Sequence, residues 1–229
     1  MVPLAAPLGR SERRVAAASY VSGLLMPGQR KSIEPMAARL GVDPQRLQQF
    51  IADSPWDEEQ LWHVLRQQVI PHFEPIEAWI TDETGWLKQG KHSVGVTRQY
   101  CGQVGKQENC RVAVSLSVAT WNSSLPIAYG LYLPNEWAED SERREKTEVP
   151  KEVEFQTKPD MALDQIRAAV TAQVDRGVVL ADAAYGINTE FRDGLTELEL
   201  QYVVGVQSSM TVWEPGNWPL LVLKFASPL

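Results

Sequence analysis

Two aspartates follow short apolar segments at widely separated places in the chain. Asp82 comes after Trp79-Ile80-Thr81, and Asp182 comes after Val178-Val179-Leu180-Ala181. The pattern puts each carboxylate at the end of a strand, where a charge costs desolvation energy unless a positive group meets it. If the fold brings the two strands side by side, the carboxylates repel each other and a divalent cation is their natural partner. Mg²⁺ or Mn²⁺ suits such a site because both prefer oxygen ligands.

The spacing of these residues leaves two interpretations open. Two ions roughly 4 Å apart can activate a water or hydroxyl and stabilise the leaving oxygen in phosphodiester cleavage. Alternatively, each aspartate caps the turn or helix that follows its strand. We expect Glu83 to point to the opposite face if the strand continues, and to be structural rather than a ligand. Tyr185 and Gly186 are expected to shape the turn after Asp182, with Gly186 free to adopt a positive φ; a substrate role for the Tyr185 hydroxyl is the alternative.

The elements that precede the first aspartate are predicted to be helices. In the segment 11–25, Val15, Ala18 and Leu25 recur at helical spacing and predict the inward face. A second helix is expected to stop at Gly41, and Asp43-Pro44 starts a third. Helix, short glycine-containing turn and helix is the outline of a helix-turn-helix, although any small helical bundle has the same outline.

The period then changes from helical to strand-like. Three β-rich segments predict an antiparallel meander, and a polar segment, 135–155, is expected to be a solvated loop. An amphipathic helix should begin at Pro159 and end at Gly177, ahead of a parallel strand buried on both faces. The segments in order are 78–86, 93–101, 111–121, 126–134, 158–177, 178–181, 189–200 and 201–207. This order predicts a mixed α/β fold, with a meander on one side of the sheet and helix-linked parallel strands on the other.

The composition is that of an ordinary globular chain. It has 229 residues, of which 44% are hydrophobic and 22% charged, and no apolar run long enough to cross a membrane. The net charge of −7 counts against nucleic-acid binding, but basic residues outnumber acidic ones in 1–50 and in 88–111. Cys101 and Cys110 are expected to be reduced thiols, and the three histidines show no metal-ligand spacing.

Several words in the sequence resemble the insertion-sequence transposases of the Asp-Asp-Glu (DDE) superfamily. They are DETGWLKQGKHSVGVTRQYCGQVGKQENCRVAVSL, LYLPNEWAED, FQTKPDMAL and ADAAYG, in the same order along roughly Val15 to Gly216. The branch is the one whose first aspartate lies in a DETG-aromatic-xKxG word. The resemblance implies a ribonuclease H-like core, divalent metal (Mg²⁺ or Mn²⁺), and DNA cleavage followed by transfer of the new 3′-hydroxyl to target DNA.

Carried over onto this sequence, the resemblance makes Asp82 and Asp182 the first and second metal-binding, catalytic aspartates. The third acid of the family is a glutamate on a later helix, and Glu214, among Pro and Gly, is a poor substitute for it. We therefore expect a truncated or frame-shifted copy that is inactive alone. The alternative is a non-catalytic remnant that binds DNA or a full-length transposase; an unrelated two-aspartate hydrolase would not explain the shared words.

The expected organisation is a helical amino-terminal module (1–72), an incomplete ribonuclease H-like core (73–207) and an irregular tail (208–229). Lys88, Lys91, Arg98 and Lys106 lie around the first hairpin and either contact phosphates of DNA or form a solvated face. The expected partners are the element ends and target DNA, with a homo-oligomer or a full-length transposase also compatible. We expect no membrane partner and a cytoplasmic location, associated with the nucleoid when DNA is bound.

Overall fold

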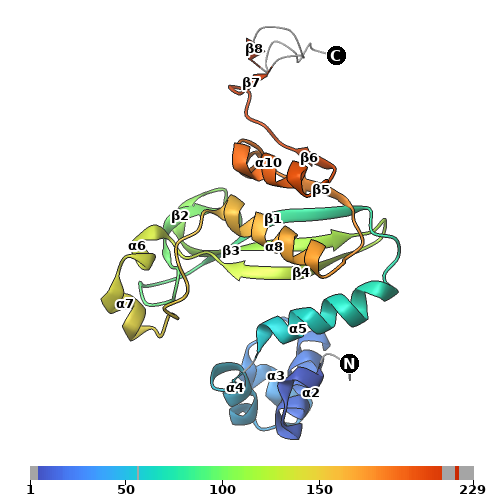
Figure 1. The fold of residues 1–229 in the computed structure, drawn as a ribbon. Coiled ribbons are helices and arrows are strands. Elements are labelled where there is room, and N and C mark those ends of the chain that lie inside the picture. Colours follow the sequence, from blue (N-terminus) through green and yellow to red (C-terminus); the bar gives the residue numbers. More distant parts are fainter. Residues whose placement is uncertain (1–4, 56, 213–219, 222–229) are drawn as a thin grey trace. The chain divides into compact units, whose positions relative to one another are not determined.

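The computed structural model describes residues 5–55, 57–212 and 220–221. The chain divides into two compact units, Met1–His72 and Phe73–Leu229 (Figure 1). No helix in the described part of the chain is both long enough and apolar enough to span a membrane.

The first unit consists of short helices around a small apolar core. Met36, Leu47 and Phe50 are buried, and the ring of Phe50 lies 6.5 Å from that of Tyr20. Asp43 caps the third of the main helices by accepting a hydrogen bond from the Gln45 amide, as the Asp43-Pro44 pair predicted. The elements are η1 (Ala6–Leu8), α2 (Ser11–Leu25), α3 (Ile33–Leu40), α4 (Pro44–Ala52), α5 (Glu58–Val64), the π-helical turn η2 (Leu65–Val69) and η3 (Ile70–His72).

The inward face of α2 differs from the predicted one. Val15 and Leu25 are 62% and 80% exposed, whereas Gly23 is buried against Met36. The helix packs through a face of small residues because a Cβ at position 23 would already lie 3.1 Å from the Met36 Cβ. Apolar spacing alone selected the wrong side, since α2 has larger apolar side chains facing solvent than facing its neighbours.

The second unit is built on a mixed six-stranded sheet, which confirms the predicted mixed α/β class (Figure 1). The path β2-β3-β1-β5-β6 makes β3 antiparallel to β1 and β2, while β1, β5 and β6 are parallel. The three segments predicted as a meander do pair antiparallel in chain order, β2 with β3 and β3 with β4. They do not lie in that order across the sheet, because β2 and β4 share one edge of the long strand β3 and β1 takes the other. The strands are β1 (Ala78–Leu87), β2 (Thr97–Cys101), β3 (Lys106–Ala119), β4 (Ser124–Leu131), β5 (Val178–Ala181) and β6 (Tyr202–Val204).

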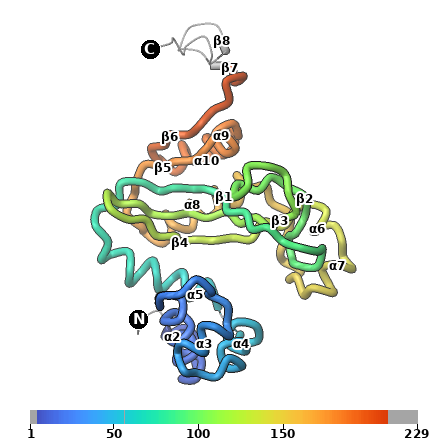
Figure 2. Tube along the Cα trace, turned by 180° about the vertical axis from the view of Figure 1, so that it is seen from behind, coloured from blue at the N-terminus to red at the C-terminus, as the bar shows by residue number. Residues whose placement is uncertain are grey.

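Helix α8 crosses one face of this sheet in Figure 1, and Figure 2 shows the same unit from behind. Leu163 and Ile166 of this helix are buried, and so is Val174 just beyond it. The helix ends at Thr171, well before the predicted end at Gly177. The chain leaves the helix early because Gln173 adopts a left-handed conformation, with φ of 57°. The helices of this unit are α6 (Asn135–Ala138), α7 (Ser141–Lys146), α8 (Lys158–Thr171), α9 (Ala183–Gly186) and α10 (Thr189–Glu197).

Two segments differ from their predicted irregular structure. The polar segment 135–155 contains α6 and α7, and Trp137 is fully buried there, donating its indole N–H to the Val96 carbonyl at 2.8 Å. A single large aromatic ring thus anchors a segment that its charged residues made look solvated. In the tail, β7 (Thr211–Val212) pairs with β8 (Leu220–Leu221). Glu214 lies outside the described residues.

The two faces of β1 have different surroundings. Trp79, Thr81 and Gly85 are buried on one face, whereas Asp82, Thr84 and Trp86 are exposed. Strand side chains alternate between faces, so residues of even number on β1 point away from the buried side. The strand β5 is buried mainly on one face, through Val179, rather than on both as predicted.

Candidate active site

Asp82 and Asp182 lie at matching positions on neighbouring parallel strands. The paired residues of β1 and β5 are Ala78 with Val178, Trp79 with Val179, and Ile80 with Leu180. Each aspartate follows the last pair by two residues, so both continue the face of Ile80 and Leu180. The predicted adjacency of the two strands is therefore present.

The position of Asp82 within its strand is a correction. We expected the strand to end at this residue, but β1 continues to Leu87 because it stays paired with β3, Asp82 being opposite Ser115 and Leu87 opposite Cys110. Only the pairing with β5 stops before Asp82. The aspartate thus lies where β1 leaves its parallel neighbour and its side chain becomes accessible.

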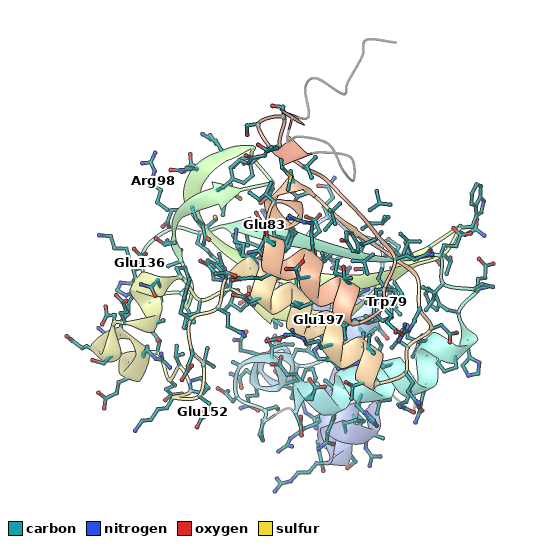
Figure 3. All side chains as sticks on the ribbon, turned by 45° about the horizontal axis from the view of Figure 1, so that its top comes forward. Trp79, Glu83, Arg98, Glu136, Glu152 and Glu197 are labelled. Carbon is teal, nitrogen blue, oxygen red and sulfur yellow. The ribbon has the colours of Figure 1, made fainter. Side chains whose placement is uncertain are left out.

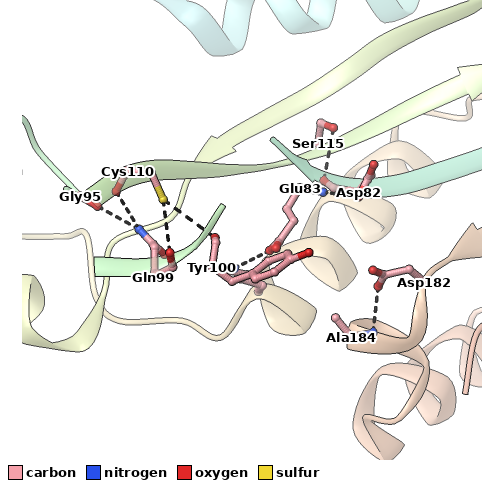
Figure 4. A network of polar contacts seen from close by, with 10 residues as sticks. Asp82, Glu83, Gly95, Gln99, Tyr100, Cys110, Ser115, Asp182 and Ala184 are labelled. Carbon is pink, nitrogen blue, oxygen red and sulfur yellow. Dashed lines mark hydrogen bonds and ion pairs between the residues drawn. The ribbon is translucent and has the colours of Figure 1, made fainter. Parts of the chain in front are cut away.

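Each aspartate is held by one of its two carboxylate oxygens. Oδ1 of Asp82 accepts the Glu83 amide at 2.7 Å, and Oδ1 of Asp182 accepts the Ala184 amide at 2.9 Å (Figure 4). The second bond makes Asp182 the N-cap of α9, so capping does occur there. Both residues are exposed, and the Oδ2 atoms make no hydrogen bond to the described protein groups. These two free oxygens are hard donors of the kind that Mg²⁺ and Mn²⁺ take.

Glu83 lies on the face opposite Asp82, as expected for the next residue of a continuing strand. Its carboxylate forms an ion pair with the ammonium of Lys158, which follows the N-cap of α8. Both side chains are mostly buried, with 17% and 23% exposed. The pair connects β1 to the first turn of α8 and gives Glu83 a cationic partner, whereas Asp82 has none among the described residues.

Tyr185 is in α9, the short helix that Asp182 caps, and is 1% exposed. Its hydroxyl is buried without a hydrogen-bond partner among the described residues, and its ring packs 5.8 Å from that of Phe191. Burial raises the pKa of this hydroxyl, and the charges of Glu83, Asp82 and Asp182 raise it further. The hydroxyl therefore stays protonated and lies within the field of all three carboxylates.

Gly186 is required by space rather than by conformation. We expected a positive φ at Gly186, but its φ is not positive. The need for glycine is steric instead, because a Cβ there would lie 1.9 Å from the Gly205 carbonyl oxygen. The close approach lets α9 pack directly against the end of β6. It thereby fixes the turn that begins at Asp182.

The four basic residues predicted to contact DNA lie around the β1–β3 end of the sheet. Arg98 projects outward from β2 and is exposed (Figure 3). Lys91 is exposed too, whereas Lys106 is paired with Glu108 at 2.9 Å, which reduces its availability to a phosphate. Their contact with DNA stays a prediction.

Sequence reasoning missed the side chains that surround Glu83. Lys158 was present in the word FQTKPDMAL, and Tyr132 in LYLPNEWAED, but neither has a local pattern that predicts a site. Burial raises the pKa of the Tyr132 hydroxyl, and the charge of Glu83 adds to this. The ammonium of Lys158 lies 5.4 Å from the Tyr132 ring centroid. Only the packing of α8 on the sheet brings these residues together.

Comparison with protein families gives a match over most of the chain. Residues 3–221 match the model of the DDE superfamily endonucleases. The chain belongs to this superfamily. It is 32% identical over 192 residues to a probable transposase for insertion sequence element IS701 from Microchaete diplosiphon, covering 82% of this chain and 47% of that protein. The chain thus spans about half the length of this relative.

Two solved structures of the Mos1 transposase show a more distant similarity. A paired-end complex with the left transposon end matches with a TM-score of 0.30 and 16% identity, over 82% of this chain and 57% of that chain. A Mos1 mariner paired-end complex with Mn matches with a TM-score of 0.26 and 15% identity over the same shares. TM-scores of this size do not define a common fold.

Proposed function

We propose that this chain carries two of the metal-binding carboxylates of a DDE transposase, which cleaves a DNA strand and transfers the new end. Asp82 and Asp182 are the residues that would hold Mg²⁺ or Mn²⁺. The observation that carries the proposal is the register of β1 and β5, which aligns the two aspartates at the point where the strands separate.

The surroundings of the two carboxylates fit a divalent ion. Each carboxylate is oriented through Oδ1 by a backbone amide, and each keeps Oδ2 free of hydrogen bonds to the described protein groups. Oriented, exposed carboxylates that share no protein cation repel each other, and a bound divalent ion relieves this repulsion. In two-ion sites the bound metal activates the attacking oxygen and stabilises the leaving one.

The order of the strands supports a ribonuclease H-like core for the second unit. The central strand β1 is antiparallel to the long β3 on one side and parallel to β5 on the other. Helix α8 lies in the connection between the antiparallel strands and β5. This arrangement sets the carboxyl ends of the parallel strands at one edge, where α/β sheets bind their ligands. We propose a DNA-binding role for the first unit, because basic residues outnumber acidic residues within residues 1–50.

Binding of Mn²⁺ tests the metal site directly. Titration of the protein with Mn²⁺, followed by loss of the free-ion electron paramagnetic resonance signal, is expected to show binding that Asp82→Asn and Asp182→Asn each weaken at least tenfold. Asp193→Asn changes an exposed carboxylate on α10 and serves as the matched control. Equal affinity in the wild type and both site variants would remove the basis of the proposal.

A further inference from the structure

A second site lies on the other side of β1 from the two aspartates. A pocket of about 440 Å³ is bounded by Glu83, Tyr100, Tyr132, Lys158, Pro159 and Tyr185, among others. This volume is within the range of roughly 300–1,000 Å³ that is typical of small-molecule sites. Glu83 is adjacent to Asp82 in β1, and Tyr185 follows Asp182 in α9, so the pocket and the aspartates share the same two elements.

An unsatisfied polar group points to a ligand in this pocket. Tyr185 is one of the residues that line the pocket, it is 1% exposed, and its buried hydroxyl has no hydrogen-bond partner among the described residues. Buried polar groups in folded proteins are nearly always hydrogen-bonded, because leaving one unpaired costs its hydration. A ligand that offers an acceptor to this hydroxyl would remove that cost.

The charges around the pocket select the kind of ligand. The ion pair between Glu83 and Lys158 leaves the lining without net charge. The carboxylates of Asp82, Glu83 and Asp182 all act on the Tyr185 hydroxyl. A phosphate or other anion is disfavoured here, because its own charge would add to this negative field. A neutral group with several hydrogen-bonding atoms fits better.

The aromatic lining favours a planar ligand. Tyr100 is 52% exposed and lies at the pocket, and Figure 4 shows its ring beside the Glu83 carboxylate. Aromatic faces of this kind stack on nucleic-acid bases with little dependence on the base sequence. Tyr132 forms a second aromatic wall, already in contact with the Lys158 ammonium.

We propose that this pocket binds one unstacked base of the DNA strand that the two aspartates act on. Tyr100 stacks on the base, the Tyr185 hydroxyl donates a hydrogen bond to a ring nitrogen or carbonyl oxygen, and Glu83 accepts one from an exocyclic amine. A base held here would keep its strand beside β1, which carries Asp82, and beside α9, which Asp182 caps. This inference rests on the proposed function for its DNA ligand.

The test uses the full chain in EDTA and a short single-stranded oligothymidylate that carries one central 2-aminopurine. Stacking of the reporter base on a tyrosine quenches its fluorescence, which gives both the affinity and the environment of the base. We expect quenching with the wild-type protein. Tyr100→Ala should weaken binding about fivefold or more, the smallest effect typical of losing one stacked aromatic residue. The loss should persist at high salt, since stacking does not depend on counterion release.

Tyr185→Phe tests the hydroxyl without disturbing the packing of the ring. Because it removes an unpaired buried group, this variant should fold and melt at the same or a higher temperature, yet bind the reporter several-fold more weakly. Tyr129→Phe is the matched control, since Tyr129 is opposite Ser115 on the β3–β4 pair and its ring is tilted against that of Trp86 rather than lining the pocket.

The outcomes separate this inference from the metal site. If Tyr100→Ala and Tyr185→Phe bind and quench the reporter as the wild type does, the base pocket is wrong, whatever the Mn²⁺ titration shows. If both variants lose affinity while the Tyr129→Phe control does not, the pocket stands. That result would hold even if Asp82→Asn and Asp182→Asn left Mn²⁺ affinity unchanged, in which case only the metal proposal fails.

Discussion

Gly177 lies against the backbone of Ala78, at the point where β5 begins beside β1. A Cβ at position 177 would be 2.8 Å from the N, Cα and C atoms of Ala78. This contact precedes the first pair of the parallel ladder, Ala78 with Val178. The register that aligns the two aspartates therefore starts from a close backbone approach that only glycine permits.

Substitution of Gly177 should destabilise the fold. Gly177→Ala forces β1 and β5 apart or shifts them, and we expect a loss of about 1–3 kcal/mol in the free energy of unfolding. Urea denaturation measures this loss. Gly102→Ala is the control, because nothing lies within 4 Å of a Cβ there, and we expect a change of less than about 0.5 kcal/mol. Equal stability of the two variants would show that the register does not depend on this contact.

Binding of DNA should depend on Arg98 through its charge. If Arg98 neutralises one phosphate, Arg98→Gln makes the negative slope of log K against log salt shallower by about 0.9 on duplex DNA. Fluorescence anisotropy of the full chain between 50 and about 200 mM salt, the range over which such slopes are resolved, provides the measurement. Lys151→Gln removes an exposed positive charge outside the hairpin and should leave the slope as it is. An unchanged slope in Arg98→Gln would assign this side chain to a solvated face.

The stability of the second unit should fall at alkaline pH because of Cys110. Burial, followed by the neighbouring Cys101, raises the pKa of the Cys110 thiol to about 11. An unfolded thiol titrates near about 8.5, so the stabilisation is complete below that pH and is lost as pH rises toward 11. Above about 10, the raised pKa of Tyr185 acts in the same direction.

Urea unfolding at pH 7.5 and at pH 10 tests this dependence. The decrease in stability between these two pH values should be smaller in Cys110→Ala than in the wild type. Val112→Ala shrinks the same apolar cluster without removing a titratable group, and should keep the wild-type decrease. A Cys110→Ala protein with the full decrease would mean that other groups cause it.

We expect that this chain does not nick DNA by itself. Among them, no three His, Cys, Asp or Glu side chains form a group that could hold a metal, and Glu83 is on the opposite face in an ion pair with Lys158. Two aspartates can fix one ion, but a second would be loosely held, and a misplacement of about 1 Å can cost roughly a hundredfold in rate. Incubation of the chain with Mn²⁺ and labelled transposon-end DNA checks this expectation. Specific nicking that disappears in Asp82→Asn would contradict it and indicate a further acid in the site.

The sequence by itself determined the local structure around the candidate site. The cap at Asp43, the helix start beside Pro159, the apolar segment before Asp182 and the β-rich segments between them are properties of neighbouring residues. Such patterns are readable because strand and helix periods are set by a few consecutive side chains. The words around Asp82 and Asp182 likewise indicated the superfamily before any fold was known.

Only the tertiary structure decided which distant residues meet. The pairing of β1 with both β3 and β5 kept Asp82 inside a strand, and the packing of α8 placed Lys158 on Glu83. The burial of Trp137, and that of Gly23 on the inward face of α2, also differed from what their local patterns predicted. In each case the deciding contact joins residues remote in sequence. Its free energy depends on the shape of the partner surface, which a local pattern does not contain.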